Sequence, residues 1–265
     1  MIEPFLKWPG GKRWLVSRHI DLFPKKYKRY FEPFLGGGAV FFSLMPSQAR
    51  LSDLNTELVN AYKCLKCNHE EIERGLAHYQ RRHSSDFYYK IRGERPSDPI
   101  KRAIRFLYLN RTCFNGIYRV NLHGVFNVPI GTKTTVNFET GYLGTIAASL
   151  KKATIEVCDF EQAINEAEEG DFIYVDPPYT VAHNNNGFVK YNARLFSWPD
   201  QARLAKALKS AGARDVLVML SNADHPSVRA LYDGFGQQRT LSRQSVLSGD
   251  SSFRRSATEL LITNF

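Results

Sequence analysis

The sequence predicts an α/β protein whose doubly wound sheet is interrupted by a mainly helical insertion. Short apolar segments alternate with helical patterns near both ends of the chain, whereas the middle has mostly helical periodicity. Such alternation favours parallel strands with helices packed on both faces of the sheet. A chain of 265 residues is long enough for one large domain with an insertion. We expect a sheet domain formed by residues 1–58 and 151–265, and an inserted domain formed by residues 59–150.

The first part supplies two strands that are joined by a glycine-rich turn. Strand-like segments are predicted at Tyr30–Pro33 and Arg50–Asp53. Between them, Gly36-Gly37-Gly38 precedes an apolar helix start. Because glycine lacks a Cβ, this turn lets the backbone approach a ligand closely, although a plain turn is the alternative. A dinucleotide-binding loop is not expected, because Phe41 occupies the place of the third glycine of that motif.

The insertion begins with a helical pattern and ends in turn-forming residues. Apolar residues recur at helical spacing at Leu58, Val59, Tyr62 and Leu65. Cys64 and Cys67 lie inside this pattern, and no second pair follows them, so we expect two incidental thiols rather than a zinc site. Glycine, asparagine and proline punctuate residues 115–131, which predicts a hairpin-like stretch with a chain reversal.

The last part returns to strands alternating with helices. Strands are predicted at Thr154–Val157, Phe172–Val175, Asp215–Leu220 and Glu259–Thr263, and helices at Phe160–Glu168 and Gln201–Ser210. The segment Ser197-Trp198-Pro199-Asp200 combines a serine cap, an early proline and an acid at the third position, which predicts a helix start. The polar segment His183–Asn192 before it is either a loop that closes over a ligand or a mobile surface loop.

The chain carries an excess of positive charge. Thirty-six Lys and Arg against 26 Asp and Glu give a net charge of +10 and an isoelectric point near 9.4. Such a field favours polyanions through phosphate contacts and counterion release, although charge alone fits a basic soluble protein equally well. The start of the chain lacks a signal-peptide pattern, and no apolar run approaches the ~18 residues of a membrane span. We therefore expect a soluble cytoplasmic protein with reduced cysteines and no membrane partner.

The segment Asp176-Pro177-Pro178-Tyr179 is the strongest candidate for a catalytic site. It directly follows the predicted strand Phe172–Val175, and its two prolines must end strand pairing because proline lacks the ladder donor. In an open α/β sheet, ligands bind at the carboxyl ends of the strands. Asp176 and a proline carbonyl can each accept an N–H from an amino group on a flat ring. Tyr179 can stack on that ring.

Further residues extend this candidate site toward a nucleoside ligand. Glu32 precedes the glycine turn, where its carboxylate suits a cationic or zwitterionic group. Asp53 lies 17 residues past Gly36 at the end of a predicted strand, where an acid typically binds ribose hydroxyls. Capping of the following helix is the alternative role of Asp53. Trp8 and Lys12 flank a Gly-Gly bend that suits the wall of a nucleoside site, or forms a plain turn.

These motifs together resemble a known family. In chain order they are Lys7-Trp8-x-Gly-Gly-Lys12, Glu32-Pro33-Phe34-x-Gly-Gly-Gly, Ser52-Asp53-x-Asn55, Asn110-Arg111-x-Cys-Phe114-Asn115-Gly116-x-Tyr118-Arg119, Phe126-Asn127-Val128-Pro129 and Asp176-Pro177-Pro178-Tyr179. The set is similar to that of the Dam-type (D12 class, alpha group) DNA adenine-N6 methyltransferases. The resemblance implies a Rossmann-like methyltransferase sheet, S-adenosylmethionine as the cofactor and double-stranded DNA as the partner.

The resemblance also implies roles for individual residues. Cofactor contacts are implied at Trp8, Lys12, Asp53 and Asp176, with Glu32 and Phe34 lining the same pocket and Gly36 and Gly38 in its turn. The insertion 59–150 would be the target-recognition domain, in which Arg119 contacts a guanine. DNA contacts are implied at Phe114, Asn115, Ile117, Arg119 and Pro129, and more loosely at Asn121, Arg111 and Lys133. Phe114 stands where several relatives have tyrosine, and the lost hydroxyl changes the contacts available beside the displaced base.

The resemblance implies methyl transfer to adenine N6 in duplex DNA after base flipping, at a GATC-like site, which is the family's commonest target. Alternatives with the same fold are methylation of cytosine N4 or of RNA, and Asp176 before Pro-Pro-Tyr favours adenine. A DNA-binding module with an inactive site is an alternative of another class, against which the intact Asp176–Tyr179 motif argues. Phe41 disfavours a nicotinamide dehydrogenase. We expect a monomer without a metal, and the sequence leaves open whether the enzyme serves mismatch repair, gene regulation, restriction protection or a phage.

Overall fold

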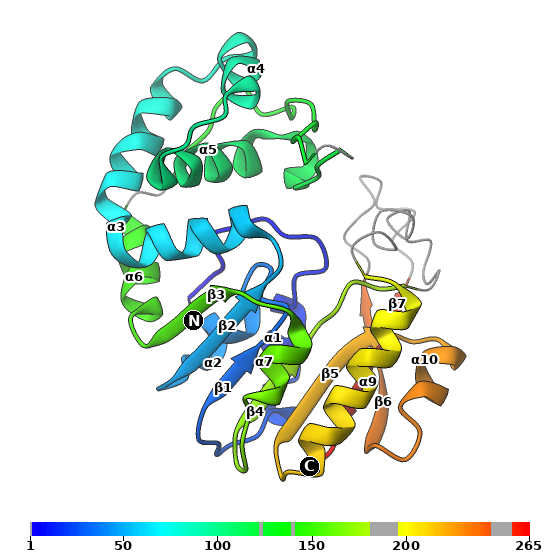
Figure 1. Cartoon of the computed structure of the whole chain (residues 1–265). Helices are drawn as coiled ribbons and strands as arrows, with labels where there is room; N and C mark the ends of the chain where they lie inside the picture. Colours follow the sequence, from blue (N-terminus) through cyan, green and yellow to red (C-terminus); the bar gives the residue numbers. More distant parts are fainter. Residues whose placement is uncertain (1, 122–123, 139–140, 181–195, 245–255) are drawn as a thin grey trace. The chain divides into compact units, whose positions relative to one another are not determined.

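The computed structural model describes residues 2–121, 124–138, 141–180, 196–244 and 256–265 (Figure 1). The chain divides into two compact units, and each is treated by itself. The helix-rich unit comprises Met1–Val16, Leu35–Ser47 and Asp53–Val157, and the sheet unit comprises Ser17–Phe34, Gln48–Ser52 and Cys158–Phe265. The predicted division into a sheet domain of residues 1–58 and 151–265 and an inserted domain of residues 59–150 stays a prediction. The predicted loop His183–Asn192 lies outside the described residues.

Within the described ranges, a seven-stranded sheet has the order β3-β2-β1-β4-β5-β7-β6. The strands are β1 (Tyr30–Glu32), β2 (Ala49–Asp53), β3 (Ala153–Val157), β4 (Phe172–Val175), β5 (Leu217–Ala223), β6 (Gln237–Gln244) and β7 (Ser256–Thr263). The pairs β1–β2, β1–β4 and β4–β5 are parallel, whereas β7 is antiparallel to both β5 and β6. Parallel neighbours need crossover connections, which helices supply. The predicted α/β class with a doubly wound order is confirmed.

The helices alternate with the strands and fill the middle of the chain. They are α1 (Arg13–Arg18), α2 (Ala39–Leu44), α3 (Thr56–Arg81), α4 (Ser85–Gly93), α5 (Pro99–Thr112), α6 (Gly141–Leu150), α7 (Phe160–Asn165), α9 (Trp198–Gly212) and α10 (Pro226–Leu231), with the 3-10 turns η1 (Ile20–Leu22) and η2 (Phe114–Gly116). In the helix-rich unit, α3 packs against α5, α6 and β3. Across the part of the chain that is described, no helix is long and apolar enough to cross a membrane.

The core of the sheet unit lies between one face of the sheet and the helices α7 and α9. Side chains alternate between the two faces along a strand, so every second residue contributes to this core. The cluster includes Ile173, Val175, Val218 and Leu220 from the strands, and Leu204 and Leu208 from α9. On the opposite face, Tyr30 and Phe172 bring their ring centroids within 5.7 Å of each other. The sheet is therefore buried on both faces around β4, which explains the continuous apolar run there.

Three elements differ from those that the sequence predicts. The strand predicted from Asp215 begins at Leu217, because Asp215 takes a left-handed turn conformation with φ of 59°. The helix predicted to reach Glu168 ends at Asn165. Strand β6 was not predicted, because its polar sequence lacks an apolar alternation; it pairs only with β7 at the edge of the sheet, where polar side chains are usual. The predicted start of α9 is confirmed by a complete capping box between Ser197 and Asp200.

The stretch that follows α5 doubles back without forming a regular ladder. Isolated antiparallel bridges join Cys113 to Ile130 and Val120 to Phe126. The predicted hairpin-like stretch does bring its two arms together, and among its described residues they are joined by these single bridges rather than by a regular ladder. We call residues 113–131, where the resemblance implies contacts with DNA, the recognition stretch.

Candidate active site

The Asp176-Pro177-Pro178-Tyr179 turn lies directly after β4, as the sequence predicts. Strand β4 ends at Val175, so both prolines lie beyond the ladder. Pro177 is buried, whereas Asp176, Pro178 and Tyr179 are half-buried. A buried proline therefore anchors the turn, while the acid and the aromatic ring keep part of their surface accessible.

Glu32 shares an edge of the sheet with this turn. Glu32 is the last residue of β1, and β1 pairs in parallel with β4. The register sets Tyr30 opposite Phe172, so the two strands end side by side at their carboxyl ends. Glu32 and Asp176 thus lie at the edge where open α/β sheets bind their ligands.

A buried tyrosine holds the Glu32 side chain. The Tyr30 hydroxyl donates a hydrogen bond of 2.7 Å to Glu32 Oε2, and both side chains are buried. Burial raises the pKa of Tyr30 well above its usual value, and the Glu32 carboxylate raises it further. The phenol therefore stays protonated at neutral pH and acts as a permanent donor to the carboxylate.

Phe34 belongs to an aromatic cluster in the same unit. Its ring stacks on Phe160, with centroids 5.4 Å apart and 22° between the planes. It meets Phe196 edge-on at 5.5 Å. Phe160 and Phe196 are buried, whereas Phe34 is half-buried at the margin of the core. Phe34 therefore presents a fixed apolar surface two residues after Glu32.

The glycine turn is filled by protein side chains. Gly36 and Gly38 have φ of 47° and 66°, in the left-handed region that favours glycine. A Cβ on Gly36 would lie 2.8 Å from two indole atoms of Trp8, and one on Gly38 would lie 2.8 Å from the Tyr62 hydroxyl. From the sequence, these glycines either let a ligand approach the backbone closely or form a plain turn. In the structure, the side chains of Trp8 and Tyr62 occupy the space beside them. Trp8 is thereby held against the turn.

Asp53 joins the glycine turn to the start of α3. Its Oδ2 accepts the Gly36 N–H at 3.1 Å, and its Oδ1 accepts the Asn55 N–H at 2.9 Å. Asn55 itself caps α3, because its Oδ1 accepts the N–H groups of Glu57 and Leu58. The capping role considered for Asp53 is therefore taken by Asn55. Burial raises the pKa of Asp53, and the backbone N–H bonds partly offset this effect.

The predicted cofactor residues form one set in each unit. Lys12 is buried, and its Nζ donates to the Gly10 carbonyl at 3.0 Å, which keeps the ammonium close to the Gly-Gly bend. The helix-rich unit holds Trp8, Lys12, Gly36, Gly38 and Asp53, and the sheet unit holds Glu32, Phe34 and Asp176–Tyr179. In the helix-rich unit, Trp8 and Asp53 both contact Gly36, and in the sheet unit Glu32 and Asp176 lie at the ends of paired strands.

The predicted DNA contacts lie on the recognition stretch of the helix-rich unit. Ile117 is half-buried, and the exposed residues are Phe114, Asn115, Arg119, Asn121 and Pro129. Asn115 takes a left-handed conformation with φ of 55°, which turns the chain sharply after Phe114. An irregular stretch that exposes apolar and polar side chains together suits contact with base edges.

Arg119 is oriented by a neighbour across the recognition stretch. Its Nε donates to Asn127 Oδ1 at 3.2 Å. Among the described residues, the two terminal nitrogens of Arg119 have no hydrogen-bond partner, and the side chain is exposed. The exposed guanidinium group is therefore held on one side by Asn127, and its two terminal nitrogens keep their capacity to donate hydrogen bonds.

Three cations gather beside this stretch. Burial lowers the pKa of Lys7, and the positive charges of Lys133 and Arg111 lower it further. The Lys7 side chain runs along Gly116, where a Cβ would lie 2.8 Å from Lys7 Cβ. Such a concentration of positive charge favours phosphate groups.

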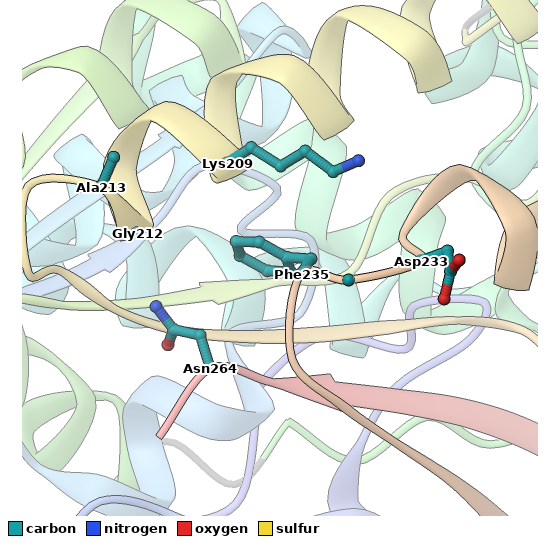
Figure 2. Close-up of a pocket in the computed structure, with 7 residues that line it drawn as sticks. Lys209, Gly212, Ala213, Asp233, Phe235 and Asn264 are labelled. Carbon is teal, nitrogen blue, oxygen red and sulfur yellow. The ribbon is translucent and has the colours of Figure 1, made fainter.

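A surface hollow elsewhere in the sheet unit is separate from these residues. It measures about 480 Å³ and is lined by Lys209, Gly212, Ala213, Asp233, Gly234, Phe235 and Asn264 (Figure 2). Asn264 follows Thr263 of β7, which pairs with Met219 near the amino end of β5. The hollow thus lies at the edge opposite the carboxyl ends of the parallel strands. Among the described residues, no cluster of three or more His, Cys, Asp or Glu side chains could hold a metal.

Sequence reasoning gave no role to four residues that contact the predicted site. They are Tyr30, Asn110, Tyr118 and Asn127. Tyr30 lies two positions before Glu32 on one strand, and this spacing places both on one face, so a local signal existed. Asn110 contacts Lys7 across 103 residues, for which a single sequence offers no signal.

Comparisons with known proteins agree with the motifs. The family model described as D12 class N6 adenine-specific DNA methyltransferase matches residues 8–246. The chain is 38% identical to the type II methyltransferase M1.LlaDCHI of Lactococcus lactis subsp. cremoris, over 100% of this chain and 96% of that protein. It is 31% identical to the DNA adenine methylase of Escherichia coli, over 97% of this chain and 93% of that protein.

A solved structure aligns over the whole chain at low similarity. It is a precorrin 8w decarboxylase of Methanobacterium thermoautotrophicum, with 11% identity, a TM-score of 0.41, and coverage of 100% of this chain and 99% of that one. The family rests instead on the sequence matches, which span the glycine turn, the recognition stretch and the Asp176–Tyr179 turn. The chain therefore belongs to the D12 class of N6 adenine-specific DNA methyltransferases and is an enzyme of this kind.

Proposed function

We propose that this enzyme methylates N6 of an adenine within a GATC-like sequence of duplex DNA, after that adenine has turned out of the helix. Its family implies DNA as the substrate and S-adenosylmethionine as the methyl donor. The observation that carries the proposal is the Asp176–Tyr179 turn at the carboxyl end of β4, beside Glu32 at the end of β1. We further propose that residues 59–150 recognise the target, that residues 1–58 and 151–265 perform catalysis, and that the enzyme works as a cytoplasmic monomer.

The Asp176–Tyr179 turn suits an amino group attached to a flat ring. Adenine N6 is a poor nucleophile, because its lone pair is delocalised into the ring. Two acceptors on its N–H groups favour a pyramidal nitrogen, and the Asp176 carboxylate and the Pro177 carbonyl can supply them. Transfer of the methyl group would break its bond to the donor's sulfur, leaving S-adenosylhomocysteine as a neutral thioether, and N6 would give up one proton, which the Asp176 carboxylate can accept. Positioning and electrostatic stabilisation then account for most of the rate.

Each unit holds side chains that suit one part of S-adenosylmethionine, which would supply an electrophilic methyl group when bound. The Glu32 carboxylate is buried and oriented by Tyr30, and it can accept hydrogen bonds from an ammonium group. An ionised carboxylate offers about four acceptor positions, and on Asp53 the backbone N–H groups of Gly36, Leu54 and Asn55 use three of them. Asp53 can therefore still accept a ribose hydroxyl. The half-buried Trp8 ring offers an apolar face to a nucleobase.

Base flipping follows from the geometry of duplex DNA. An adenine N6 inside the stack cannot reach a half-buried carboxylate, so the base must leave the helix and pay the cost of unstacking. The half-buried ring of Tyr179 can replace the lost stacking. Phe114 and Asn115 are exposed on the recognition stretch, where they can fill the gap left in the duplex.

The test compares two aspartate variants in the full-length protein. Purified wild type is incubated with duplex DNA and S-adenosylmethionine carrying a tritiated methyl group, and the nucleosides are separated by liquid chromatography with mass detection. The wild type is expected to form N6-methyladenine. Asp176→Ala is expected to form none while binding the duplex as tightly as wild type. The matched control Asp86→Ala removes one exposed carboxylate from α4 and is expected to retain full activity.

Three outcomes would contradict the proposal. An active Asp176→Ala enzyme would remove the carboxylate from the mechanism. N4-methylcytosine in the digest would change the target base, and methyl groups on RNA alone would change the substrate. Duplex affinity is measured by fluorescence anisotropy at one fixed salt concentration, because protein–DNA affinity depends steeply on salt.

A further inference from the structure

Two stacked rings connect the Trp8 segment with the recognition stretch inside the helix-rich unit. The ring centroids of Trp8 and Tyr118 lie 6.1 Å apart, and their planes differ by 17°. The Trp8 indole also lies against Gly36, where a Cβ would come within 2.8 Å of it. Trp8 therefore contacts the glycine turn and Tyr118 at the same time.

Tyr118 is held by further aromatic neighbours. Its ring lies 4.9 Å from that of Phe106 on α5 and 5.5 Å from that of Phe126 on the returning arm of the recognition stretch. Both phenylalanines are buried. Close-packed rings have few alternative arrangements, so a shift of Trp8 is transmitted to Tyr118 rather than absorbed.

Arg119 follows Tyr118 directly in the chain. The Tyr118 ring is half-buried among these aromatics, whereas the Arg119 side chain is exposed. The Arg119 carbonyl accepts the Asn127 N–H at 3.4 Å, and Asn127 Oδ1 accepts from Arg119 Nε. The orientation of Arg119 therefore depends on the backbone that Tyr118 anchors.

Asn110 makes a second connection between the same two segments. Its Nδ2 donates to the carbonyl of Lys7 at 2.8 Å and to that of Gly116 at 3.2 Å. Lys7 precedes Trp8, and Gly116 lies two residues before Tyr118. One buried amide thus fixes the backbone on both sides of the stacked pair.

We infer that Tyr118 is a positioning residue that couples cofactor binding at Trp8 to target recognition by Arg119. A ligand that fixes the Trp8 indole also fixes Tyr118 and the backbone that carries Arg119. Coupling of binding free energies is reciprocal, so target DNA strengthens cofactor binding by the same factor. The inference rests on the proposed function, which assigns the cofactor to Trp8 and the DNA to Arg119.

The experiment measures the coupling factor in the full-length enzyme. Sinefungin is an analogue of S-adenosylmethionine that transfers no methyl group. It is titrated by calorimetry with and without an unmethylated duplex that contains a GATC sequence. Wild type is expected to bind sinefungin more tightly in the presence of the duplex, by a factor within the usual range of about 5 to 150. In Tyr118→Leu the factor is expected to fall toward one. Tyr118→Phe keeps the stacked ring and is expected to keep the factor.

The control Tyr89→Leu removes an exposed tyrosine ring from α4 and is expected to leave the factor unchanged. If Tyr118→Leu loses its cooperative unfolding transition, Tyr118→Met replaces it, because methionine fills the space without a flat ring. A wild-type factor of one, or an undiminished factor in the Leu or Met variant, would overturn the inference. A wild type that binds neither sinefungin nor the duplex would instead refute the proposed function, and the inference would fall with it.

Discussion

The side-chain amide of Asn110 forms two hydrogen bonds with the backbone of Lys7, in the way that the backbone of a neighbouring β-strand would. Its Nδ2 donates to the Lys7 carbonyl at 2.8 Å, and its Oδ1 accepts the Lys7 N–H at 3.0 Å. Asn110 is buried, and 103 residues separate the two partners along the chain. A single amide side chain therefore satisfies the backbone that leads into Trp8.

Replacing Asn110 by alanine leaves buried backbone groups without partners. We expect Asn110→Ala to lower the free energy of unfolding by about 1–3 kcal/mol, the usual cost of an unsatisfied buried polar group. Sinefungin affinity should fall as well, because Lys7 adjoins Trp8. Urea unfolding measures the first effect and calorimetry the second. The exposed Asn165 provides a control, and a loss in Asn110→Ala no larger than that of Asn165→Ala would contradict the account.

Two buried tyrosines provide a matched test of the Glu32 contact. Tyr30 donates to Glu32, whereas among the described residues the Tyr232 hydroxyl is buried without a hydrogen-bond partner. We expect Tyr30→Phe to lose about 1.5–3 kcal/mol of stability, because its hydrogen bond goes to a charged group. Tyr232→Phe should be neutral or stabilising. Tyr30→Phe should also weaken sinefungin binding, since Glu32 loses its orienting donor.

Chemical denaturation of both variants and calorimetry with sinefungin decide this comparison. If the two variants lose the same amount of stability, the hydrogen bond from the Tyr30 hydroxyl to Glu32 does not stabilise the fold. If Tyr30→Phe binds sinefungin as tightly as wild type, the hydrogen bond from Tyr30 to Glu32 is not needed for cofactor binding.

The sequence predicts positions along the chain better than partners in space. Asp176 could be placed at a strand end, because an apolar run stopped by two prolines leaves little choice. The partners of Asp53 were not predictable in the same way: the carboxylate contacts Gly36, while Asn55 takes the helix cap. Strand β6 was missed because an edge strand needs no apolar face of its own.

The recognition stretch shows the same limit. Glycine, asparagine and proline predict that the chain turns, but they do not say which side chain each turn exposes. Tyr118 stacks on Trp8, whereas Arg119 next to it is exposed. Both facts depend on packing between segments that are about a hundred residues apart in the chain. Such contacts become visible only when the chain is folded.

Arg119→Ala tests readout by the recognition stretch. A bidentate contact with guanine contributes about 1–3 kcal/mol of discrimination, so we expect this variant to lose preference at one position of the site. Competition binding against duplexes with single substitutions measures the loss. Arg81→Ala removes an exposed arginine at the end of α3 and should keep the preference. A uniform loss of affinity for all sequences would identify Arg119 as a phosphate contact.

Cysteine reactivity tests the packing of the same stretch. Burial raises the pKa of Cys113 to about 11, so its thiol remains protonated and unreactive at pH 8, and thiolate appears only as the pH rises toward that value. Cys67 is exposed. We expect iodoacetamide at pH 8 to label Cys67 in the native protein and Cys113 only after unfolding, as read by peptide mass mapping. Labelling of both at equal rates would show that the recognition stretch is open.

The most direct test of the central claim is the modification pattern of DNA from cells that express the protein. Long-read sequencing of plasmid DNA reports the modified base, its position and its sequence context together. We predict N6-methyladenine at one GATC-like sequence with the wild type and none with Asp176→Ala at equal expression. N4-methylcytosine, or undiminished adenine methylation with Asp176→Ala, would contradict the account.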